Sequence, residues 1–159
     1  MPPAQDETAP AQLKARLRAD LTTAMKARDE LRTATLRMVL AAISAEEVSG
    51  KEARELSDDE VQSVVRREAK KRREAAEAFA GAGRGPQADR ERAEEGVLAD
   101  YLPAQLDDAD LAALVADAIT TTGAAGMKDM GRVMGAATAA VAGRAEGSRV
   151  AAEVRRQLG

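Results

Sequence analysis

The stretch LSDDEVQSVVRREAKKRREAAEAF, residues 56–79, decides the fold class. Ser57 and Glu60 have the spacing of a capping box at the start of a helix. Leu56 and Val61 stand at the two positions of a hydrophobic staple around that cap. Apolar side chains then recur within about 80° of one another on a helical projection. They are Val61, Val65, Ala69, Ala76 and Phe79. We therefore predict a long amphipathic helix that packs this face inward.

Two further helices are predicted upstream of this stretch. A first helix begins at about Pro10, because apolar residues recur every four positions: Leu13, Leu17, Leu21 and Met25. Asp29 is placed to cap a second helix that runs to about Val48. Apolar residues cover a wide arc of that second helix, which is typical of a central helix in a bundle.

Downstream, the segment GAGRGP at residues 81–86 ends the long helix. A strongly charged fourth helix is predicted from about Gln87 to Tyr101, and Pro103 stops it. The fraction of charged residues then falls from 38% in residues 1–100 to 22% in residues 101–159. This change supports a domain boundary near residues 101–106.

Three helices are predicted after the boundary. Asp107 caps the first, which carries Leu111 and frays into the segment TTTGAAG. The second runs from about Met127 to Ala142, with Gly143 as the residue that closes it. The third spans about residues 146–158. We therefore predict an all-α protein: a disordered tail at 1–9, an N-terminal domain of about four helices at 10–102, and a three-helix C-terminal domain at 103–159.

Composition excludes several kinds of chemistry. The 159 residues include no Cys and no His, which excludes disulfides, thiolate zinc sites and Ser-His-Asp triads. Alanine supplies 37 residues, whereas Leu, Ile, Val and Phe together supply 27, so helices are expected to approach one another closely. No apolar run approaches the roughly 18 residues of a membrane span, and MPPAQDETAP does not resemble a secretory signal. We expect a cytoplasmic protein with no membrane association, cofactor or metal.

The most conspicuous candidate site is the basic run RREAKKRR at residues 66–73. Its candidate nucleic-acid-binding residues are Arg66, Arg67, Lys70, Lys71 and Arg73. A basic helix face can neutralise phosphates and release counterions. The alternative is a solvated face balanced by Glu68, Glu74 and Glu77 at helical spacing. Arg72 projects onto the apolar stripe, so its charge must reach solvent or find a carboxylate.

A second candidate surface lies in the segment 127–136. Gly131 and Gly135 interrupt a predicted helix, where glycine costs about 1 kcal/mol relative to alanine. Either a neighbouring helix approaches closely there, or an RNA backbone approaches beside Lys128 and Arg132. The methionines of this segment are interpreted as core filling rather than as a binding surface. They are Met127, Met130 and Met134.

Two other features have competing interpretations. A carboxylate cluster could perform acid–base chemistry or hold a divalent ion, although helices rich in Glu and Arg are ordinary. It consists of Glu91, Glu94, Glu95 and Asp100. Tyr101 and Leu102 are expected to form a hinge plug between the two domains, with the tyrosine ring buried and its hydroxyl hydrogen-bonded.

Four segments together resemble the GatB/YqeY family, over about residues 12–158. They are LRMVLAAI (36–43), YLPAQL (101–106), MKDMGRVMGA (127–136) and GRAEGSRVAAEVRRQL (143–158). The resemblance is to free-standing YqeY-like proteins, whose C-terminal part is similar to the tail of the B subunit of glutamine-dependent aminoacyl-tRNA amidotransferase. In that enzyme the tail helps to hold tRNA, while catalysis belongs to a separate cradle domain and to the amidase subunit. The resemblance therefore assigns no catalytic residue to this chain. Glu146 departs from the family, which usually has Asp there, a better helix cap.

Three functions follow from these observations. The first is a noncatalytic accessory module that binds tRNA or a tRNA–enzyme complex through the 66–73 face and the surface at Lys128 and Arg132. The second is a protein-interaction adaptor without RNA. The third, which the family label implies, is a carbon–nitrogen ligase that uses glutamine as amido-N-donor.

Overall fold

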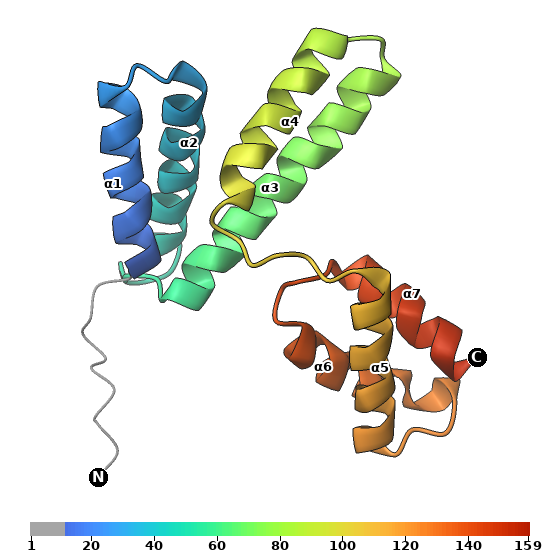
Figure 1. The fold of residues 1–159 in the computed structure, drawn as a ribbon. Coiled ribbons are helices and arrows are strands. Elements are labelled where there is room, and N and C mark those ends of the chain that lie inside the picture. The colour runs from blue at the N-terminus through green and yellow to red at the C-terminus, as the bar shows by residue number, and fades with distance from the viewer. Residues whose placement is uncertain (1–11) are drawn as a thin grey trace. The chain divides into compact units, whose positions relative to one another are not determined.

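The computed structural model describes residues 12–159, and it is all-α over that range, as predicted. Seven α-helices and one 3-10 turn, with no strand, make up the described part of the chain (Figure 1). They are α1 (Gln12–Lys26), α2 (Glu30–Glu47), α3 (Asp58–Gly81), α4 (Gly85–Ala99), α5 (Asp108–Thr122), η1 (Met127–Asp129), α6 (Met130–Val141) and α7 (Gly147–Leu158). The tail predicted at residues 1–9 lies outside the described residues. No helix in 12–159 has the length and apolarity to cross a membrane.

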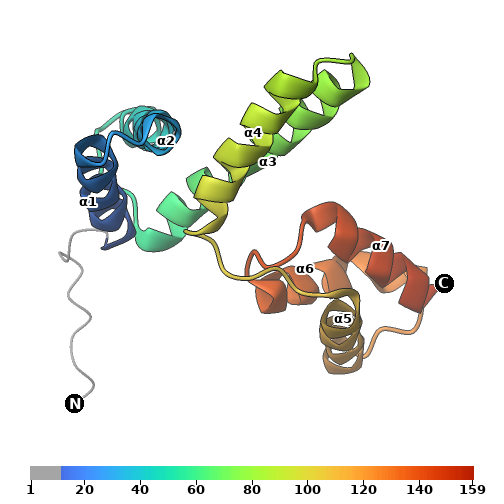
Figure 2. The same cartoon turned by 45° about the horizontal axis from the view of Figure 1, so that its top comes forward.

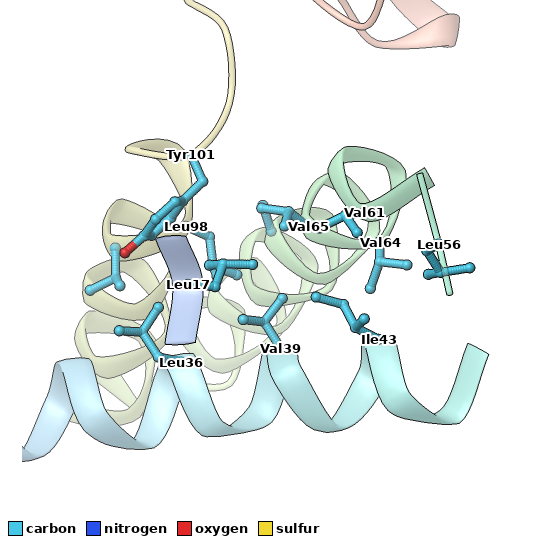
Figure 3. Close-up of a cluster of buried hydrophobic side chains, with 12 residues drawn as sticks. Leu17, Leu36, Val39, Ile43, Leu56, Val61, Val64, Val65, Leu98 and Tyr101 are labelled. Atoms are coloured by element: carbon cyan, nitrogen blue, oxygen red, sulfur yellow. The ribbon is translucent and has the colours of Figure 1, made fainter. Parts of the chain in front are cut away.

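The described residues form two compact units, one that ends at Leu102 and one that begins at Pro103. In the first unit, α1 and α2 form one antiparallel hairpin and α3 and α4 form another (Figures 1 and 2). Figure 3 shows the core between them, where side chains of α2 and α3 face one another. Val39 and Ile43 of α2 lie opposite the valines of α3, and Leu36 lies toward the end of the cluster that holds Leu98 and Tyr101. The same cluster also contains Leu17, Leu56, Ala69 and Val97.

The start of α3 confirms the predicted capping box. Ser57 Oγ accepts a hydrogen bond from the amide of Glu60, and Glu60 Oε1 accepts one from the amide of Ser57, both at 3.3 Å. Leu56 and Val61 are both buried in the core, as a hydrophobic staple requires. The start of α4 is two residues earlier than predicted, because Pro86 fits the first helical turn, where its missing amide hydrogen is not needed.

The second unit packs α5, α6 and α7 around a separate core. Val115, Val133 and Val154 are fully buried at its centre. Asp107 caps α5 as predicted and accepts a hydrogen bond from the amide of Asp110 at 2.7 Å. The predicted fraying of α5 is wrong, because the helix ends on Gly123, whose left-handed backbone (φ 66°) terminates it cleanly.

One residue of the predicted apolar stripe on α1 is not buried. Met25 is 49% exposed, and Ala24 takes its place in the interior. Four residues of helix turn the chain by about 400°, so a strict four-residue repeat drifts by about 40° at each step. Three such steps from Leu13 carry Met25 off the buried face. Lys14 lies three residues before the buried Leu17 and so shares its face of α1, where its ammonium pairs with Glu47 at 2.7 Å.

Candidate nucleic-acid interface

The basic run on α3 is largely neutralised within its own unit. Five of its cationic side chains form ion pairs with glutamates of α2, α3 or α4. The pairs are Arg67–Glu46 (3.3 Å), Lys70–Glu74 (3.9 Å), Lys71–Glu68 (3.1 Å), Arg72–Glu68 (2.9 Å) and Arg73–Glu95 (2.8 Å). Arg66 instead donates from Nη2 to Gln62 Oε1 at 3.3 Å. A phosphate would therefore have to compete with carboxylates for most of this face.

Arg72 is a charged residue on the apolar stripe of α3, and its charge is compensated there. Its side chain is only 12% exposed, and it lies between two buried carboxylates. Its Nη1 contacts Glu68 Oε2 at 2.9 Å, and its Nε lies 3.5 Å from Glu94 Oε2. Of the two outcomes predicted for Arg72, reaching solvent or finding a carboxylate, the second is the one observed. The sequence did not indicate which glutamates are buried, because Glu94 reaches Arg72 from another helix.

On the second unit, Lys128 lies in η1 and Arg132 in the first turn of α6, and they differ in their contacts. Arg132 donates from Nη1 to the carbonyl of Thr122 at 2.9 Å and from Nη2 to Asp129 Oδ1 at 2.8 Å. Asp129 also accepts from the amide of Ala125, and these two donors lower the pKa of its carboxyl. Lys128 is exposed, and its ammonium forms no ion pair or hydrogen bond within residues 12–159. Arg132 is thus a structural clamp on the α5–α6 connection, and Lys128 is available to a ligand.

The two glycines of α6 face open space. A Cβ atom built on Gly131 or on Gly135 would meet nothing within 4 Å. The predicted close approach of a neighbouring helix is therefore wrong. The helix turns Val133, Ala137 and Val141 toward the core, which leaves both glycines on its exposed side. The surface of α6 next to Lys128 is consequently an accessible stretch of helix backbone.

The methionines of this segment divide into two groups. Met130 and Met134 pack against the core of the second unit, which confirms their interpretation as core filling. The prediction is wrong for Met127, which is 48% exposed in the η1 turn before α6 begins.

Three members of the predicted carboxylate cluster are engaged by arginines. Glu94 contacts Arg72 and Arg90, Glu95 contacts Arg73, and Asp100 contacts Arg32 at 3.6 Å. Within residues 12–159, no three or more Asp, Glu, His or Cys side chains are grouped so that they could hold a metal ion. The geometry gives these carboxylates a structural use as partners of arginine.

Tyr101 is buried and hydrogen-bonded, as predicted. Its hydroxyl donates to Asp20 Oδ2 at 2.5 Å and accepts from Arg32 Nη2 at 3.3 Å. The Arg16 guanidinium lies over the ring, 4.7 Å from its centroid. Burial and the Asp20 carboxylate raise the pKa of Tyr101 to about 12. The ring belongs to the core of the first unit, and its use as a plug between the two units stays a prediction.

A comparison with known proteins places the chain in a family. No curated protein matches the sequence. A family model described as Yqey-like protein matches residues 14–158, which is nearly the whole chain and includes the described helices of both units except the first two residues of α1. The chain therefore belongs to the YqeY-like protein family.

Proposed function

We propose that this protein is a noncatalytic, tRNA-associated binding module whose RNA-contacting surface is the exposed side of η1 and α6. The observation that carries the proposal is the pair of open glycines at 131 and 135 beside the unpaired ammonium of Lys128. Gly135, in the interior of α6, costs about 1 kcal/mol of helix stability relative to alanine, while Gly131 lies in the first turn of that helix. No packing contact inside the unit explains either glycine. Close approach of a ligand to the helix backbone is a use that glycine serves and a side chain obstructs.

The resemblance to the tail of the amidotransferase B subunit supports RNA as the ligand. The α3 run supports it less, since ion pairs with glutamate already occupy most of its cations. Lys128 provides an exposed cation beside the exposed side of α6 at Gly131 and Gly135, called here the glycine face, and phosphates of a backbone would be attracted there. Arg132 is already paired with Asp129 and contributes less.

The test is fluorescence anisotropy of bulk tRNA binding to the full chain at about 50 and 200 mM salt. The key variant is Gly131→Gln/Gly135→Gln. Its two added side chains fit without a clash and cover helix backbone that is exposed in the parent. Its matched control is Gly96→Gln, because Gly96 is also exposed within a helix and would meet nothing within 4 Å. Glutamine is a better helix former than glycine, so the double variant should be more stable than the parent by about 1 kcal/mol.

We expect the double variant to bind tRNA at least about tenfold more weakly, with Gly96→Gln unchanged and Lys128→Glu weakened with a smaller salt slope. Because the double variant gains stability, its loss of binding would not be due to unfolding.

Absence of tRNA binding at low salt would overturn the proposed function. Loss of binding only in Arg66→Glu/Lys70→Glu/Arg73→Glu would keep the function and move the site to α3. Ammonia release from glutamine by the chain would contradict the noncatalytic assignment.

A further inference from the structure

Unpaired positive charge in the first unit gathers on the α1–α2 hairpin rather than on the basic run of α3. The guanidinium groups of Arg18, Arg28 and Arg37 are exposed and make no ion pair or hydrogen bond within the described chain. This differs from α3, where glutamates neutralise five cations. Isolated arginines on one face are available to an anionic partner without first losing an internal carboxylate.

Two of these arginines border a surface hollow at the end of the hairpin. The hollow has a volume of about 410 Å³, and its lining residues come from the end of α1, the turn after it and the first half of α2. Its lining residues are Met25, Arg28, Asp29, Glu30, Thr33, Ala34 and Arg37. Met25 supplies the largest apolar side chain there and is half exposed. An exposed methionine is flexible and adapts its shape to an apolar partner.

The third arginine extends this surface along the hairpin. Arg18 precedes Met25 by seven residues, which is about two helical turns, so both lie on the same side of α1. Its charge acts on Glu47 of α2, whose pKa is lowered chiefly by the hydrogen bond from Lys14 and also by Arg18. Arg18, Met25, Arg28 and Arg37 therefore define one surface, called here the hairpin face.

The carboxylates of the hairpin face already have partners. Asp29 caps α2 and accepts a hydrogen bond from the amide of Arg32 at 3.0 Å. Glu30 lies 3.5 Å from Arg90 of α4, and Glu47 pairs with Lys14 at 2.7 Å. Three arginines against Asp29 and Glu30 leave the face with a positive net charge, although the whole chain has a formal net charge of −3.

We propose that the hairpin face is a docking site for an acidic amphipathic helix of a protein partner. Carboxylates of such a helix would pair with Arg18, Arg28 and Arg37, and an apolar side chain would enter the hollow against Met25. The charge complementarity selects an acidic partner, and the methionine-lined hollow selects a partner with an apolar anchor. A nucleic acid would satisfy only the first requirement. The site is separate from the glycine face of α6, so it does not depend on the proposed RNA function.

The test uses methyl NMR of the full chain labelled at its methionines. Met25 reports on the hairpin face, Met38 on another side of α2, and Met127 on the second unit. The probe is a synthetic helical peptide of about 15 residues with leucines on one face and glutamates on the other. A control peptide keeps every glutamate and replaces each leucine by glutamine. The site variant is Arg28→Glu/Arg37→Glu, and its matched control is Lys51→Glu, another exposed cation of this unit.

We expect a saturable shift of the Met25 methyl signal on adding the leucine-containing peptide, with Met127 unchanged. Affinity should fall at least about tenfold in Arg28→Glu/Arg37→Glu and less than twofold in Lys51→Glu. Equal binding of the control peptide would overturn the proposal, because the hollow would then contribute nothing. A Met25 shift produced more strongly by tRNA, by a peptide of residues 1–11, or by raising the concentration of the chain alone would also overturn it.

Discussion

Tyr101 is a buried residue of the first unit whose polar atom is hydrogen-bonded on two sides. It is the single tyrosine of the chain, its ring is 4% exposed, and residues of α1 and α2 surround its hydroxyl. A phenol that donates to a carboxylate is stabilised in its neutral form. The pKa of the Tyr101 hydroxyl therefore reports on whether α1 and α2 are packed around it.

We expect the tyrosinate absorbance of the native chain to appear with a midpoint near pH 12 instead of pH 10. The folded pKa lies above the unfolded pKa, so the contribution of Tyr101 to stability is complete below about pH 10. It is lost as the pH rises toward about 12. Tyr101→Phe should lower the free energy of unfolding by about 2 kcal/mol at pH 8, and this difference should narrow between pH 10 and 12. An absorbance midpoint near pH 10 in the folded chain would contradict the buried hydrogen bond.

At the residue scale, the sequence predicted burial best where the angular position of a residue around its helix decides whether its side chain faces the core. It identified Val61, Val65 and Tyr101 as interior, and they are. It failed at Met25, where the drift of a four-residue repeat decides exposure, and at Gly131 and Gly135. The space around a glycine depends on the neighbouring helix, and no local pattern encodes the position of that neighbour.

At the scale of elements, the α3–α4 hairpin is held together by buried charge as well as by apolar packing. Glu68 and Glu94 are 7% and 8% exposed, and Arg72 lies between them. Arg90 adds a second cation to Glu94 at 3.2 Å. Removing one member of such a network leaves an uncompensated buried charge. The resulting loss in the free energy of unfolding is larger than the net stabilisation that the intact pair provides.

Arg72→Met should therefore destabilise the first unit by about 3 kcal/mol, although methionine fits an apolar stripe better than arginine does. Arg92→Met is the matched control, because Arg92 pairs with Asp89 at the exposed surface of α4, and it should cost less than about 1 kcal/mol. Urea denaturation of both variants measures the difference. Equal stability of Arg72→Met and the parent would show that the two glutamates do not need their cation.

The sequence specified the ends of helices far better than the partners of their side chains. Caps at Asp29, Ser57 and Asp107 are local, since each involves residues three apart. The ion pair of Arg73 with Glu95 joins residues 22 apart on two helices. For the basic run the sequence left open a cationic face or one balanced by glutamates of the same helix, and Glu68 and Glu74 do pair with it. Only the packing of the helices showed the further pairs with Glu46 and Glu95.

At the scale of the whole molecule, the two units have separate hydrophobic cores that differ in amino-acid composition. The first combines valines with four leucines, an isoleucine and Tyr101, whereas the second consists mainly of valine and alanine. Residues 103–159 are also few for one hydrophobic core, because small domains bury a smaller fraction of their surface. We expect the second unit to unfold first on heating, in a transition separate from that of the first.

Two core substitutions test this division, because each removes about the same volume from one unit. Val65 and Val133 are both fully buried, and each Val→Ala change should cost about 2 kcal/mol within its own unit. Val133→Ala should lower the transition followed by the methyl signals of Met130 and Met134 by about 10 °C and leave the tyrosine signal of Tyr101 in place. Val65→Ala should do the reverse. If either substitution moved both signals together, the two cores would unfold as one cooperative unit, and a surface on one unit could then be perturbed from the other.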